Sequence, residues 1–161
     1  MRKFDEYGLK MCRYQGQLFS LSRDKVNCST PIFLRRFMYS GVAKRMDGEG
    51  FLFEAITQED VLGEIEDEFG KSGYGQIKYD EEELYWIGYI YRYWCYTRQI
   101  SSRSLYKMIK PEELRKVYYP YHSLDPAQAI ERILESKGLR EKDMIERGVA
   151  ILKKLRAAKG M

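Results

Sequence analysis

The chain has 161 residues, of which 44% are hydrophobic and 32% charged, so it has the size of one ordinary domain with a buried core. No segment approaches the run of roughly 18 apolar residues that a membrane-spanning helix needs, and the charged first ten residues lack the apolar stretch of a signal peptide. We therefore expect a cytoplasmic protein that folds as a single domain over residues 1–161.

The net charge of +4 is distributed in three blocks along the chain. Residues 1–46 carry +7, residues 47–84 carry −11 and residues 85–161 carry +8. Such blocks are typical of a basic face separated from an acidic face, an arrangement that steers charged partners. They fit equally well with solvated helix surfaces whose charges pair across the fold, and the sequence leaves both interpretations open.

The first part of the chain shows helical spacing. Apolar residues at steps of three and four predict a first helix over residues 4–21. Ser29 or Thr30 is a suitable N-cap for a second helix, because Pro31 follows at a position where its missing N–H costs nothing. We expect this second helix to run to about Met46.

A turn and a short acidic helix follow. The sequence DGEG at residues 47–50 is a turn signal. Thr57 and Asp60 have the spacing of a capping box, and the helix that they open should end at Gly70. Beyond it we expect a loop, with at most a short extended piece at residues 76–79.

Residues 84–98 hold seven of the chain's 23 aromatic residues, including both tryptophans. Asp80 and Glu83 form a capping signal before them and predict a helix that is apolar on nearly every side. A strand would also suit the aromatic residues, but its alternation would place Arg92 on the same face as both tryptophans. A helix of this kind is usually buried, although its five tyrosines also suit a protein-binding surface.

Helical signals continue after the aromatic segment. Residues 100–109 read as a turn and a short helix capped by Ser101 or Ser102. Pro111 opens another helix, which Pro120 should break.

The end of the chain carries two more helical signals. Asp125 and Pro126 are a cap and a first helical residue, and Gly138 is a stop signal. Residues 145–158 have the spacing of an amphipathic terminal helix. We therefore predict an all-α fold, a single compact domain of about seven helices.

The residues needed for catalysis or for metal binding are scarce. His122 is the only histidine, and the three cysteines, Cys12, Cys28 and Cys95, are far apart and show no CxxC spacing. Free thiols of this kind fit a reducing compartment. Gly70, Lys71 and Ser72 mimic the end of a phosphate-binding loop, but Ile65 stands where that loop needs a glycine. We expect no enzyme activity, no catalytic residues, no metal and no cofactor.

Two kinds of binding remain. Basic residues lie among aromatic ones in the segment 98–116, as in a helix-turn-helix-like regulator that binds DNA or RNA, and the candidate contacts are Arg98, Arg103, Lys107 and Lys110. The segment is poor in the Asn and Gln side chains that read base edges. The other hypothesis is a protein-binding surface of aromatic and arginine anchors. Its predicted residues are Tyr89, Arg92, Tyr93, Tyr96 and Arg98, with a second patch of Tyr118, Tyr119 and Tyr121.

Two stretches, ELYWIGYIYRYWCYTR at residues 83–98 and YYPYHSLDPAQAIERI at residues 118–133, resemble a family of small uncharacterised bacterial proteins. Members of that family are encoded beside toxin-like genes, some of them similar to ADP-ribosyltransferases. The resemblance extends from Pro31 to the terminal helix. It implies an antitoxin-like or accessory role, in which the protein binds a toxin and covers its active surface, and it assigns no functional residues. We therefore expect a non-enzymatic protein-protein interaction module.

Overall fold

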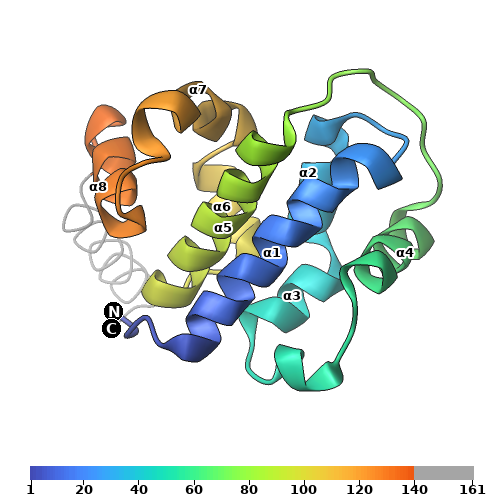
Figure 1. Cartoon of the computed structure of the whole chain (residues 1–161), viewed down its shortest axis with the longest axis horizontal. Helices are drawn as coiled ribbons and strands as arrows, with labels where there is room; N and C mark the ends of the chain where they lie inside the picture. Colours follow the sequence, from blue (N-terminus) through green and yellow to red (C-terminus); the bar gives the residue numbers. More distant parts are fainter. Residues whose placement is uncertain (140–161) are drawn as a thin grey trace, which may run out of the picture. The chain divides into compact units, whose positions relative to one another are not determined.

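The computed structural model describes residues 1–139 (Figure 1). Its described part contains eight α-helices and one short 3-10 helix, and it contains no strand, so the predicted all-α fold is confirmed. Every helix in this part is too short or too polar to cross a bilayer. The chain divides into two compact units, Met1–His122 and Ser123–Met161.

Helices α1 (Glu6–Lys25) and α5 (Glu81–Arg98) lie side by side at the centre of the first unit (Figure 1). Two glycines allow this close approach. A Cβ atom added to Gly88 of α5 would lie 2.6 Å from the carbonyl oxygen of Gln15, and one added to Gly16 of α1 would lie 3.0 Å from the carbonyl oxygen of Tyr85. The two backbones are therefore in contact where larger residues would separate them.

The predicted second helix is in fact two helices, α2 (Thr30–Tyr39) and α3 (Gly41–Asp47). Ser40 separates them because its backbone is extended, with φ −75° and ψ 159°. Its hydroxyl donates to the carbonyl of Phe37 at 2.7 Å and accepts the N–H of Ala43 at 3.0 Å, so one residue ends α2 and caps α3.

A 3-10 helix, Phe51–Glu54, leads to α4 (Gln58–Phe69), which begins at the predicted capping box and ends at Gly70. The chain then crosses from α4 to α5 as a loop along the start of α2 (Figure 1). The N–H groups of Ser29 and Thr30 donate to the carbonyls of Tyr74 and Ile77 at 2.9 and 2.8 Å, which holds the extended residues without forming a strand.

Helices α6 (Ser102–Met108) and α7 (Pro111–Tyr121) complete the first unit. The prediction that Pro120 breaks the helix that begins at Pro111 is wrong, because α7 includes Pro120 and continues to Tyr121. Proline removes one N–H donor, and the carbonyl four residues earlier belongs to the exposed Lys116, where water can replace the lost bond.

The described part of the second unit is α8 (Pro126–Ser136). The carboxylate of Asp125 accepts the N–H of Ala127 at 2.9 Å, as its predicted role as N-cap requires. Gly138 follows the helix with a φ of 68°, a left-handed conformation that suits glycine. The helix predicted at residues 145–158 lies outside the described residues.

Candidate functional site

Arg92, one of the predicted partner-binding residues, lies inside the molecule with a relative exposure of 1%. Its guanidinium donates to three side chains, with distances of 2.8 Å to Gln15 Oε1, 2.8 Å to Asp47 Oδ1 and 3.1 Å to Ser102 Oγ. It therefore links α5 to α1, α3 and α6. The prediction that Arg92 is a surface anchor is wrong, because a buried cation needs these partners within the fold.

Tyr93 and Tyr96 are also buried, with exposures of 9% and 7%. The Tyr96 hydroxyl donates to Asp5 Oδ1 at 2.5 Å, and the Tyr93 ring packs on Phe4 with the ring centroids 4.6 Å apart. These two tyrosines are core residues, which corrects the prediction that they form an exposed surface. The physical reason is that α1, α6 and α7 all pack against α5, so that few of its side chains reach solvent.

The remaining residues of the predicted surface differ in exposure. Arg98 is half-buried and donates to the hydroxyl of Thr97 at 3.0 Å. Tyr89 is half-buried, and burial raises its pKa to about 12. In the second patch Tyr118 and Tyr121 are half-buried, whereas Tyr119 is 84% exposed.

Two groups of rings, which we together call the aromatic surface, are carried by α5 and the end of α7. The Trp86 ring meets the Tyr118 ring edge-on at 5.8 Å, and Tyr118 stacks on His122 at 4.5 Å. Along α5, the Tyr85 and Tyr89 rings are 6.3 Å apart. The aromatic surface comprises Tyr85, Trp86, Tyr89, Tyr118, Tyr119 and His122, none of which is fully buried. Tyr85 and Trp86 were missing from the predicted site, although the spacing of Tyr85 and Tyr89 places them on one face of α5.

His122 is exposed, and its Nδ1 lies 2.9 Å from the carbonyl oxygens of both Tyr118 and Tyr119. The three cysteines are free and buried, and burial raises the pKa of both Cys12 and Cys95 to about 12. These two thiols are therefore protonated at neutral pH and poorly nucleophilic. Within residues 1–139, no group of three His, Cys, Asp or Glu side chains is arranged to hold a metal ion.

A second cluster, which we call the basic-tyrosine cluster, joins α2 to α6 and the start of α7. The Arg103 guanidinium lies 4.6 Å from the centroid of the Tyr39 ring, and the Lys110 ammonium lies 4.4 Å from that of Tyr106. The two rings meet edge-on at 5.5 Å. The contacts join Arg35, Tyr39, Arg103, Tyr106 and Lys110. We include the exposed Lys107 in the cluster because it lies one helical turn after Arg103 on α6.

The structure thus brings three of the predicted nucleic-acid contacts, Arg103, Lys107 and Lys110, onto α6 and the start of α7, while Arg98 is the last residue of α5. Arg35 and Tyr39 were absent from the predicted nucleic-acid contacts because they lie on α2, more than sixty positions before α6.

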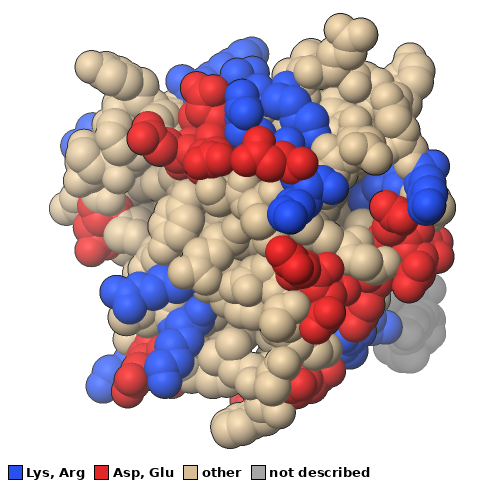
Figure 2. Space-filling model, turned by 45° about the vertical axis from the view of Figure 1, so that its right-hand side comes forward, with Lys and Arg blue, Asp and Glu red and all other residues tan. Residues whose placement is uncertain are grey.

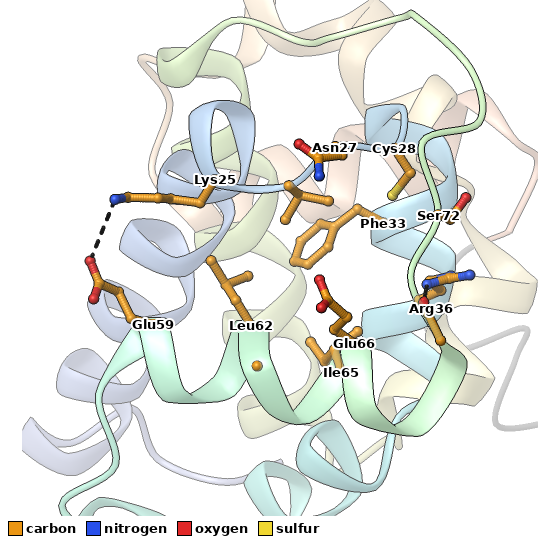
Figure 3. A pocket seen from close by; sticks show the side chains of 13 residues that line it. Lys25, Asn27, Cys28, Phe33, Arg36, Glu59, Leu62, Ile65, Glu66 and Ser72 are labelled. Atoms are coloured by element: carbon orange, nitrogen blue, oxygen red, sulfur yellow. Dashed lines mark hydrogen bonds and ion pairs between the residues drawn. The ribbon is translucent and has the colours of Figure 1, made fainter.

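A cavity of about 280 Å³ lies between α4, the junction of α1 and α2, and residues 70–72 (Figure 3). Phe33, Leu62 and Ile65 form its apolar wall. The polar rim is already engaged, because Lys25 pairs with Glu59 at 3.9 Å and Arg36 donates to the carbonyl of Gly70 at 2.6 Å. Such a cavity is slightly smaller than most small-molecule sites.

The three charge blocks of the sequence are partly paired with one another in the fold. Arg45 contacts Glu54 and Glu64 at 3.5 and 3.1 Å, and Arg115 contacts Glu83 at 3.2 Å. Figure 2 shows basic and acidic side chains in adjacent groups, separated by broad uncharged areas. The interpretation that charges pair across the fold therefore holds for these residues. By contrast, the four cations of the basic-tyrosine cluster form no ion pair within the described part of the chain.

No protein-family model, curated protein or solved structure matches the chain. The class of protein is thus given by the described fold, an α-helical protein that presents an aromatic surface and a basic-tyrosine cluster.

Proposed function

We propose that the chain is a non-enzymatic protein-protein interaction module that binds its partner through the aromatic surface. The observation that carries this proposal is the continuous set of ring contacts from Trp86 through Tyr118 to His122, next to a Tyr119 side chain that is 84% exposed. Large aromatic side chains gathered at a surface are typical of binding sites, whereas scattered single ones are not.

The chemistry of these side chains suits a protein partner. Tyrosine and tryptophan combine a large apolar area with one polar group, and they are enriched among the residues that contribute most to binding energy. Contacts between α5 and α7 also hold the aromatic surface in place. Arg115 of α7 contacts Glu83 of α5 at 3.2 Å, and Leu114 is fully buried. A surface that is rigid before binding loses less entropy when the complex forms.

The proposed partner is a toxin-like protein. Residues 83–98 and 118–133, which carry the resemblance to the toxin-associated family, include all six residues of the aromatic surface. An antitoxin-like protein would act in the cytoplasm by covering the active surface of its toxin, and this role needs binding without any chemical step.

Affinity purification from the native cells, with nuclease treatment and mass spectrometry, tests the proposal. The wild-type chain should recover one protein in near-stoichiometric amount. Replacing a central anchor costs about 1–3 kcal/mol, so Trp86→Ala and Tyr119→Ala should each weaken binding of the purified partner about fivefold to 150-fold. Phe53→Ala is the matched control, because Phe53 is 86% exposed but lies on the 3-10 helix. Equal affinity of all four chains would refute the proposed surface.

A further inference from the structure

We propose that the basic-tyrosine cluster binds single-stranded nucleic acid without sequence preference, which is a function beyond the proposed binding of a protein partner. Three cations contact the two tyrosine rings there, from α2, α6 and the start of α7. A fourth cation, the exposed Lys107, lies one helical turn after Arg103 on α6. Proteins that bind single strands combine these same two elements, cations that contact phosphates and rings on which bases stack.

The cations are available for a ligand. Arg35, Arg103, Lys107 and Lys110 are all exposed, and none has a carboxylate within ion-pair distance in the described part of the chain. Carboxylates do lie nearby on the first turn of α7. Glu113 accepts the backbone N–H of Lys110 at 2.7 Å, and the charge of Glu112 adds to the larger effect of burial in raising the pKa of Tyr106. The phosphates should therefore lie toward α2 and α6 and away from these two side chains.

The cluster is built on a fixed support. At the start of α6, the buried Ser102 hydroxyl donates to Asp47 at 2.6 Å. At its end, the Tyr91 hydroxyl donates to the carbonyl of Ile109 at 2.6 Å. These buried bonds hold α6 at both ends, so the arginine and lysine side chains project from a backbone that does not have to be ordered when a ligand binds.

The chemistry favours a single strand over a duplex or an acidic protein. Helix α6 has only seven residues, SRSLYKM, and none of them is the Asn or Gln that reads base edges in a major groove. Half-buried Tyr39 and Tyr106 offer ring surface to bases, and bases are accessible in this way only when they are unpaired. An acidic protein would use the cations but would not need the rings.

Fluorescence anisotropy with the full chain and a labelled oligothymidylate of about 12 nucleotides tests this inference. For four phosphate contacts, the logarithm of the association constant should fall with the logarithm of salt concentration at a slope of about −3. Arg103→Ala/Lys107→Ala should reduce that slope by about 1.4 and weaken binding at least tenfold at low salt. Tyr39→Leu should weaken binding while leaving the slope unchanged.

The controls separate this surface from general electrostatics and from the proposed protein interface. Lys10→Ala/Lys71→Ala also removes two exposed cations, and it should change affinity less than twofold. Trp86→Ala should bind the oligonucleotide as the wild type does. The inference is overturned if the wild type does not bind at low salt, if the two double variants lose affinity equally, or if polyglutamate or a duplex of the same length binds more tightly.

Discussion

Arg92 of α5 and Asp47, the last residue of α3, form an ion pair of 2.8 Å, although 45 positions separate them in the sequence. The side chain of Arg92 is only 2% exposed and that of Asp47 is 17% exposed. Asp47 also accepts the backbone N–H of Ser102 at 2.9 Å. One carboxylate therefore neutralises a buried cation and holds the start of α6.

Removing this carboxylate should destabilise the fold strongly. Because Asp47→Ala leaves the Arg92 guanidinium buried without its counter-charge, we expect a loss of about 3–5 kcal/mol in the free energy of unfolding, measured by urea denaturation. Arg45→Ala is the control, since Arg45 pairs with Glu64 at 40% exposure and should contribute less than about 1 kcal/mol. If Asp47→Ala lowers the free energy of unfolding no more than Arg45→Ala does, the Arg92–Asp47 pair contributes little to stability.

The bond between Tyr96 and Asp5 should make stability depend on acid. The Tyr96 hydroxyl, and then the N–H of Gly8, lower the pKa of Asp5 below its usual value. A carboxyl group with a lowered folded-state pKa stabilises the fold above its unfolded-state pKa of about 4, and this stabilisation is lost as the pH falls through the folded-state pKa.

Tyr96→Phe should therefore lower Tm most at neutral pH, and the difference from the wild type should shrink as the pH falls below about 4. NMR titration should show the pKa of Asp5 rising in this variant. Tyr119→Phe, which removes an exposed hydroxyl, should change neither quantity. A Tyr96→Phe difference in Tm that stays constant down to strongly acidic pH would contradict this account.

A pair of glycine substitutions tests the close contact of α1 and α5. An added Cβ at Gly88 would lie 2.6 Å from the carbonyl oxygen of Gln15, a backbone atom that cannot move aside, so Gly88→Ala should destabilise by about 1–3 kcal/mol. A Cβ atom added to Gly63 of α4 would have no neighbouring atom within 4 Å outside its own helix backbone. There Gly63→Ala should stabilise by about 0.5–1 kcal/mol, because alanine favours helix. Changes of the same sign in both variants, measured by urea denaturation, would contradict the packing described here.

The buried thiols should resist modification in the folded protein. Cys12, Cys28 and Cys95 are 0%, 2% and 5% exposed, and the pKa of Cys12 and of Cys95 is raised to about 12. Reaction with a thiol reagent at mildly alkaline pH should be more than about tenfold slower in the native protein than in denaturing urea. If the native Cys12→Ser/Cys95→Ser variant still reacts rapidly, Cys28 is accessible through the cavity that it lines. If the native wild type reacts rapidly and this variant does not, the burial of Cys12 and Cys95 is contradicted.

Much of the helix pattern follows from the sequence by itself. The capping boxes at Thr57 and Asp60 and at Asp80 and Glu83, and the cap at Asp125, are all present in the structure. A cap depends on side chains within three or four positions of each other, so local sequence is enough to predict it. The break at Ser40 is also a local cap, and the serine just before a glycine is a signal for it. The apolar spacing continues through this position, however, and predicted one helix.

The exposure of individual side chains was decided only by the tertiary structure. Nothing local distinguishes Tyr93 in the core from Tyr89 near the surface, because the difference depends on where α1, α6 and α7 cover α5. In the same way Arg35 and Arg103 both contact the Tyr39 ring only because α2 packs beside α6. Burial and long-range ion pairing arise from contacts between distant segments, and the period of a single helix does not contain that information.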